Sequence, residues 1–115
     1  MDIIIAGATI KDETMIQKAI ASAPEYPFSK KYILFDGLKE DSGSLKTDNY
    51  FAYTKYIANK YPEFIVIRFD ECIYFREMIE YVCGLSKADR LFVIQDDVEV
   101  MPMDLKRIVI RMNHL

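Results

Sequence analysis

The stretch LFVIQDDVEVMPMDL, residues 91–105, indicates how this chain is built. Its first four residues, 91–94, are all apolar, and a strand without polar alternation is typical of a parallel sheet covered on both faces. We therefore predict a buried, central strand there, which stops where Asp96 and Asp97 begin. Pro102, with an acid close behind it, suits the first turn of a helix, because proline is tolerated there and the helix dipole favours an acid. The stretch predicts a strand, an acidic turn and a helix that begins near Pro102.

The rest of the chain alternates apolar runs with amphipathic patterns in the same way. Three further buried strands are predicted at residues 3–6, 31–35 and 64–67. Helices are predicted from Asp12, a possible cap, to just before Pro24, over residues 48–60, and over residues 74–86. Strands that alternate with helices through short connections predict parallel pairing and right-handed crossovers. The fold class is thus α/β, a single domain over residues 1–115 with an open, mostly parallel sheet and helices on both faces.

The composition is that of an ordinary globular protein and excludes several classes. The chain has 115 residues, is 51% hydrophobic and has a formal net charge of −3. This weak acidity disfavours a nucleic-acid-binding surface, for which a basic patch is expected. No apolar run approaches the roughly 18 residues of a membrane-spanning helix, and the N-terminus lacks the layout of a signal peptide. A cytoplasmic protein is the expectation.

The two cysteines are predicted to be free. Cys72 and Cys83 fall in what we interpret as one helix. Eleven residues of helix would separate them by roughly 16 Å, which is too far for a disulfide. We therefore expect two buried thiols in a reducing compartment.

Polar residues follow several of the predicted strands and are expected to gather at one edge of the sheet. Thr9 follows the first strand, Asp36 the second, and Asp96 and Asp97 the fourth. Open α/β sheets bind their ligands outside the carboxyl ends of the strands. Two adjacent carboxylates are hard oxygen ligands suited to Mg²⁺ or Mn²⁺, and Asp36 could accept hydrogen bonds from a base or a ribose.

Each of these residues also has a purely structural interpretation. Asp96 and Asp97 suit a solvated turn, and Asp36 with Gly37 forms a common turn pair. Arg76, which could contact a phosphate, is equally consistent with a solvated cation on a helix. The aromatic stripe of the second helix could stack on a sugar or a base, although such a stripe is more often core and rim; its members are Tyr50, Tyr53 and Tyr56.

Two motifs resemble those of the GT-A fold glycosyltransferases of the family 2 kind. The first is ILFDGLKEDSGS, residues 33–44, which is similar to the family's second strand, its terminal aspartate and the Gly/Ser/Asp-rich turn behind it. The second is QDDVEVMPMDL, residues 95–105, which is similar to the family's acidic metal motif and the Met-Pro that opens a helix. Together with the alternation of strands and helices, the resemblance covers nearly all of the chain.

The resemblance implies a Rossmann-like nucleotide-binding half and a role for each matching residue. By this similarity Asp36 binds the nucleotide base, and Ala8 and Thr9 line the base and the ribose. Asp97 corresponds to the acid that coordinates Mn²⁺ or Mg²⁺ on the diphosphate of a sugar nucleotide, and Asp96 to the acid that holds the ribose or the sugar.

Three further points follow from the resemblance. Arg76 is the nearest match to an arginine that approaches the phosphates. The opening IIIAGATI, residues 3–10, departs from the family's usual proline-containing start, and Val98 stands where a polar residue is common. The family's acceptor-binding half, which carries the catalytic base, has no counterpart here. The expected function is therefore a metal-dependent glycosyltransferase, or its donor-binding half, that transfers a sugar from a nucleotide diphosphate to an acceptor hydroxyl.

Other classes of function remain open at this point. A phosphorylated receiver domain would need acids after the first strand, and a dinucleotide-binding domain would need a Gly-x-Gly-x-x-Gly turn that Gly7 alone does not supply. The stronger alternative is a non-catalytic module that binds a nucleotide or a partner protein. An exposed apolar patch on the helix that ends near Leu115 would favour it, with a partner or a second copy as its cover.

Overall fold

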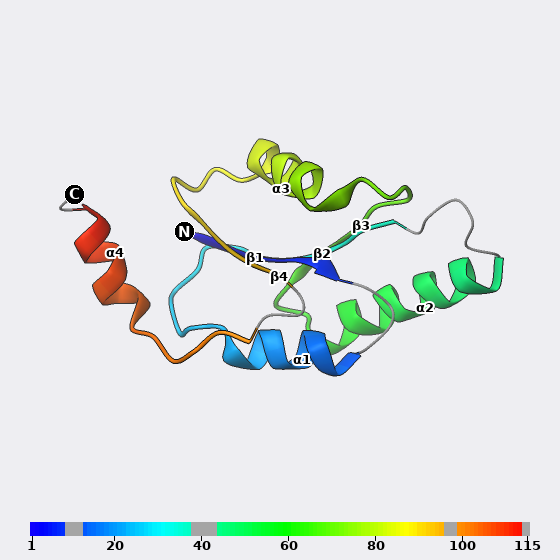
Figure 1. Cartoon of the computed structure of the whole chain (residues 1–115), viewed down its shortest axis with the longest axis horizontal. Helices are drawn as coiled ribbons and strands as arrows, with labels where there is room; N and C mark the ends of the chain where they lie inside the picture. Colours follow the sequence, from blue (N-terminus) through cyan, green and yellow to red (C-terminus); the bar gives the residue numbers. More distant parts are fainter. Residues whose placement is uncertain (9–12, 38–43, 96–98, 114–115) are drawn as a thin grey trace.

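A computed structural model of the chain describes residues 1–8, 13–37, 44–95 and 99–113. Strands and helices alternate strictly along it (Figure 1). They are β1 (Asp2–Ala8), α1 (Glu13–Ser22), β2 (Lys31–Phe35), α2 (Ser44–Lys60), β3 (Ile65–Arg68), α3 (Tyr74–Leu85), β4 (Leu91–Gln95) and α4 (Leu105–Asn113). All four predicted strands are present.

The strands form one parallel sheet in the order β3-β2-β1-β4, which confirms the predicted α/β class. The prediction that residues 91–94 form a central strand covered on both faces is wrong. β4 lies at the edge of the described sheet, where Ile94 is buried but Val93 is 38% exposed. An apolar run reports how hydrophobic a strand is, whereas its place in the sheet depends on which other strands pair with it. Here β1 and β2 take the central places.

Helices cover both faces of the sheet because successive strand residues point to opposite sides. On one face, Ile5 and Ile33 pack against Ile16 of α1 and Ile57 of α2. On the other face, neighbouring strand residues pack against α3; this second cluster includes Ile4, Ala6, Leu34, Met78 and Val82. Each fully buried aliphatic side chain contributes roughly 1.5–3 kcal/mol, so these two clusters hold the layers together. Figure 1 shows α1 and α2 below the sheet and α3 above it.

Two predicted helix starts differ from the structure. The second helix begins at Ser44, four residues before the predicted position. The last helix begins at Leu105 and not near Pro102, so that prediction is wrong. Asp104 explains the true start, because its carboxylate accepts a hydrogen bond from the N–H of Arg107 at 3.3 Å. This is the geometry of an N-cap, and the acid therefore precedes the helix. The proposed cap of the first helix, Asp12, lies outside the described residues.

The cysteines are free, but they do not share a helix. α3 begins at Tyr74, as predicted, so Cys72 precedes it and Cys83 lies within it. Tyr74 has a φ of 66°, a left-handed conformation that marks a break between the preceding loop and the helix. Cys83 is exposed, which corrects the expectation of two buried thiols.

A buried carboxylate ties the amino ends of the strands together. Asp2 is only 2% exposed, and its two oxygens accept hydrogen bonds from the N–H of Lys30 at 3.0 Å and the hydroxyl of Ser86 at 2.6 Å. Ser86 in turn accepts a hydrogen bond from the N–H of Ala88. The start of β1 is thereby joined to the start of β2 and to the connection between α3 and β4.

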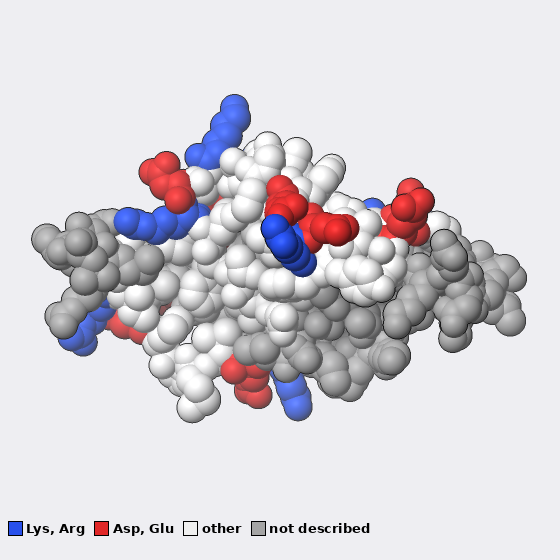
Figure 2. All heavy atoms as spheres, turned by 45° about the horizontal axis from the view of Figure 1, so that its top comes forward, with Lys and Arg blue, Asp and Glu red and all other residues white. Residues whose placement is uncertain are grey.

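Beyond β4 the chain passes along the end of α1, where the N–H of Val100 donates a hydrogen bond to Oγ of Ser22 at 2.8 Å. Figure 1 shows α4 at the left, at the end of an extended arm that passes the amino ends of the strands, and over neither face of the sheet. None of the described helices has the length and apolar content needed to cross a bilayer. On the face drawn in Figure 2, the described acidic and basic side chains are interspersed.

Candidate functional site

The strand order reverses between β1 and β4, and we take the carboxyl ends of these two strands as the candidate site. From β1 the chain passes to β2 on one side, whereas β4 pairs on the other side of β1. Helix α1, which follows β1, lies on one face, and α3, which precedes β4, lies on the opposite face. Such a reversal of direction is where open α/β sheets bind their ligands.

The strand ends that precede most of the predicted site residues lie at this edge. Ala8 is the last residue of β1 and pairs with Phe35, directly before Asp36. Gln95, the last residue of β4, pairs with Ala6. The register therefore brings the ends of three strands to one edge. Thr9, Asp96 and Asp97 follow these strand ends in the sequence and lie outside the described residues.

The carboxylate of Asp36 is held by backbone N–H groups at the start of α3. Oδ1 accepts hydrogen bonds from the N–H of Gly37 and of Ile73, both at 2.8 Å. Oδ2 accepts one from the N–H of Tyr74 at 3.0 Å and faces the thiol of Cys72 at 3.5 Å. A carboxylate offers about four acceptor positions, so these four donors occupy it. Asp36 thus fixes the corner between β2 and α3 and supports the left-handed conformation of Tyr74.

The approach of two backbone segments makes this corner tight. A Cβ atom built at Gly37 would overlap the backbone of Glu71. Glycine is therefore required after Asp36 for a steric reason, and the Asp-Gly pair is more than a generic turn. Glu71 belongs to the connection between β3 and α3, which consequently lies against the end of β2.

Arg76 is directed to solvent. Its Nε donates a hydrogen bond to Oε1 of Glu80 at 3.0 Å, one turn further along α3 and away from the carboxyl edge. The two side chains are 87% and 62% exposed, so the ion pair contributes little to stability. The structure therefore does not bring the guanidinium of Arg76 to Asp36.

The side chain of Tyr50, on α2, contacts the carboxyl ends of both β2 and β3. Its hydroxyl lies 3.1 Å from the carbonyl oxygen of Phe35 and 3.2 Å from that of Phe69, and its one proton is shared between them. Burial raises the pKa of Tyr50 above its ordinary value of 10.0; Arg68 opposes this shift, and Asp36 adds to it. The neutral phenol is consequently the form that the fold selects.

The tyrosine stripe therefore follows the core-and-rim interpretation. Tyr50 is 3% exposed, Tyr53 is half-buried against Phe35, and Tyr56 is 46% exposed. Sequence reasoning missed one neighbour of this stripe. The guanidinium carbon of Arg68, at the end of β3, lies 4.1 Å from the centre of the ring of Phe51. Periodic spacing within one element could not predict this contact, because Arg68 lies on a strand and Phe51 on a helix.

No group of three or more potential metal ligands gathers within the part of the chain that the structure describes. The metal prediction rests on Asp96 and Asp97, which fall outside that part. Comparisons of this chain with models of protein families, with curated proteins and with solved structures found no match.

Proposed function

We propose that this chain binds a nucleotide-diphosphate sugar at the carboxyl edge of its sheet, as the donor-binding part of a metal-dependent glycosyltransferase. The observation that supports this most directly is the reversal of strand order at β1 and β4. The sequence supplies two adjacent carboxylates after β4, and small or polar residues, Ala8 and Thr9, where β1 ends. Both motifs that resemble the GT-A glycosyltransferases begin on strands, β2 and β4, whose carboxyl ends lie at this edge.

In this proposal Asp97 coordinates Mn²⁺ or Mg²⁺, and Asp96 holds the ribose or the sugar. Carboxylate oxygens, diphosphate oxygens and water form the hard donor set that these cations prefer, so the residues suit the ion. The bound cation would neutralise charge on the diphosphate leaving group. The bond from the anomeric carbon to the oxygen of an acceptor hydroxyl would form as the bond to the diphosphate breaks, and the diphosphate would leave with the bonding electrons. The hydroxyl proton would pass to a general base, which in the similar glycosyltransferases belongs to the acceptor-binding half. Positioning of the two partners would supply much of the rate.

The surroundings of Asp36 refine its proposed contact with the base. Three of its four donors are backbone N–H groups, which the fold needs in place. The fourth is the thiol of Cys72, a weak donor at 3.5 Å. We therefore propose that an N–H group of the base replaces the Cys72 thiol on Oδ2. On this basis Cys72→Ala leaves nucleotide affinity unchanged or slightly improved.

The proposal also includes a location in the cell and a role for Arg76. A cytoplasmic location fits two free cysteines, since thiols persist in a reducing compartment. For Arg76, the phosphate contact requires that the guanidinium first leave Glu80. That exchange is inexpensive, because the pair is exposed.

The test is calorimetric titration of a panel of sugar nucleotides with and without Mn²⁺. The variants are Asp97→Asn and, as a matched control, Asp89→Asn, which removes the same charge from an exposed residue before the amino end of β4. We expect Mn²⁺-dependent binding of one nucleotide class, lost in Asp97→Asn and kept in Asp89→Asn. If the folded wild type binds no nucleotide, or if both variants lose binding equally, the proposal is wrong.

A non-catalytic interaction module is the second candidate, and the arm that carries α4 favours it. Met101 is 79% exposed, and Met103 and Ile108 are 40% and 39% exposed. Large apolar side chains that gather on a projecting segment mark contact sites for other chains. The test is sedimentation of the wild type at several concentrations. Self-association that the double variant Met101→Lys, Ile108→Lys abolishes would support this arm as a contact site, on which a second copy occupies the surface that a partner protein could also cover.

A further inference from the structure

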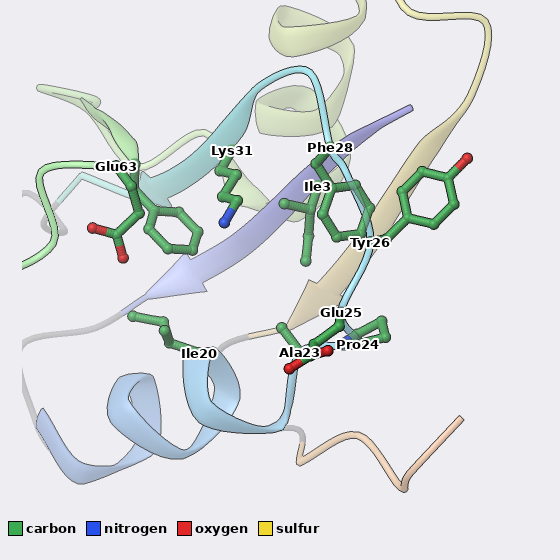
Figure 3. Close-up of a pocket in the computed structure, with 10 residues that line it drawn as sticks. Ile3, Ile20, Ala23, Pro24, Glu25, Tyr26, Phe28, Lys31 and Glu63 are labelled. Carbon is green, nitrogen blue, oxygen red and sulfur yellow. The ribbon is translucent and has the colours of Figure 1, made fainter. Parts of the chain in front are cut away.

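A cavity of about 310 Å³ opens at the amino edge of the sheet, opposite the proposed nucleotide site. Its walls come from the starts of two central strands, from the end of α1, and from the residues before β2 and β3 (Figure 3). Most of the lining residues carry apolar or aromatic side chains, among them Ile3, Ile20, Pro24, Phe28 and Phe64, and charged side chains supply the rest. The volume lies at the lower end of the range for small-molecule sites, which are typically apolar with a few polar groups.

Lys31 lines this cavity from the face of β2 on which the other side chains are apolar and buried. Side chains alternate along β2, so Lys31 lies on the same face as Ile33 and Phe35, both fully buried. Its partner in the sheet register, Ile3, is 1% exposed. Lys31 is half-buried, and Figure 3 shows its ammonium directed into the cavity between the labelled side chains of Glu63 and Ile3.

The surroundings give this ammonium little compensation. Its Nζ lies 5.8 Å from the centre of the Phe64 ring, a cation–π contact. Among the residues that the structure describes, no carboxylate comes within ion-pair distance of Lys31. The cavity therefore presents one positive charge, with open donor positions, to whatever enters it.

Two acids at the rim restrict the charge of a ligand. Glu25 and Glu63 both line the opening, and both are exposed. A ligand with two or more negative charges, such as inorganic phosphate, would meet repulsion from these carboxylates as it approached Lys31. A molecule with a single negative charge meets only half of the repulsion that a doubly charged one meets, and an apolar body suits the apolar side chains of the cavity. The polar and apolar parts of the cavity thus complement the two parts of such a molecule.

We infer that this cavity is a binding site for a small monocarboxylate with an aromatic or aliphatic body. The carboxylate accepts charge-assisted hydrogen bonds from the ammonium of Lys31. The body of the ligand packs against Ile20, Phe28 and Pro24, which are only half-buried, and so removes apolar surface from water. The site is separate from the nucleotide site proposed above, because the two lie at opposite ends of the strands, and it stands whether or not that proposal holds.

The experiment is a titration of the ¹⁵N-labelled chain with 3-phenylpropionate, followed by NMR. We expect saturable shifts of the amides of Ile3, Lys31 and Phe64, and affinity weaker by about tenfold or more in Lys31→Met, since a hydrogen bond to a charged group contributes at least that factor. The matched control is Lys30→Met, which removes the same charge from an exposed neighbour. It should leave the affinity unchanged.

A second comparison needs no variant and so does not depend on folding. The alcohol 3-phenylpropanol has the same ring and chain without the charge, and phosphate has charge without the apolar body. We expect both to bind the wild type at least about tenfold more weakly than the acid. The inference is overturned if the acid gives no saturable shifts, if the alcohol binds as well as the acid, or if Lys30→Met weakens binding as much as Lys31→Met.

Discussion

Replacing Asp36 with alanine should lower the free energy of unfolding by about 2 kcal/mol. The change removes the acceptor of three backbone N–H groups at 2.8, 2.8 and 3.0 Å. A hydrogen bond to a charged group contributes roughly 1.5–3 kcal/mol, but Tyr74 is exposed, so water can take over part of the loss. The expected value is thus close to the upper cost of losing an N-cap, about 2 kcal/mol.

Asp36→Asn separates the two oxygens. The amide oxygen can still accept from Gly37 and Ile73, whereas the amide nitrogen cannot accept from Tyr74. We expect this variant to lose about 1 kcal/mol. Asp70→Ala is the matched control, because Asp70 is an exposed acid on the same edge, and it should change stability by less than about 0.5 kcal/mol.

Urea unfolding followed by circular dichroism measures all three variants, with the slope of the free energy against urea as a check on two-state behaviour. The reasoning is refuted if Asp36→Ala costs less than about 0.5 kcal/mol, the range of an ordinary surface substitution. It is equally refuted if Asp70→Ala costs as much as Asp36→Ala, because the effect would then be one of net charge on this edge.

Two further predictions concern the same corner of the fold. Gly37→Ala should destabilise the protein by about 3 kcal/mol or more, since its Cβ would overlap the backbone of Glu71. Gly84→Ala, at an exposed helical position with open space around it, should stabilise the protein by about 0.5 kcal/mol. Thermal unfolding of both variants checks that the two changes have opposite signs. Tyr50→Phe should cost about 1 kcal/mol at neutral pH. Because burial raises the pKa of Tyr50, folding favours its protonated form, and the stability that this group contributes is complete below its ordinary value of 10.0 and is lost as the pH rises beyond it. Urea titrations at a series of alkaline pH values should therefore show a steeper loss in the wild type than in Tyr50→Phe.

The layers of this fold were predictable from sequence because they depend on local hydrophobicity and on spacing. Apolar runs located all four strands, and three-and-four spacing placed α3 from its first residue. The order of strands was not predictable in the same way. Residues 91–94 are as apolar as a central strand. In the described sheet, however, β4 pairs with β1 alone and lies at the edge, where Val93 is exposed.

The candidate site was less predictable, because a carboxylate at the end of a strand can serve either a ligand or the backbone. Asp36 meets Ile73 and Tyr74 across 37 and 38 residues of sequence, and no local pattern announces that contact. Lys31 was hidden for a related reason. Its alternation with Ile33 and Phe35 is visible in the sequence, but its place beside Ile3 depends on the register between β1 and β2.

The sign of a stability change distinguishes these two uses of a carboxylate. Asp36 accepts hydrogen bonds from three backbone N–H groups of its own fold, so its removal weakens the fold. A carboxylate that serves a cation has the opposite property, because without the ion it only repels the acid beside it. If Asp97 is a metal ligand next to Asp96, Asp97→Asn should leave the metal-free protein equally stable or slightly more stable, and should abolish the stabilisation that Mn²⁺ with the nucleotide gives the wild type. A loss of stability in metal-free Asp97→Asn comparable to that of Asp36→Asn would instead assign Asp97 to the fold, and the carboxyl edge would then hold two structural acids and no metal site.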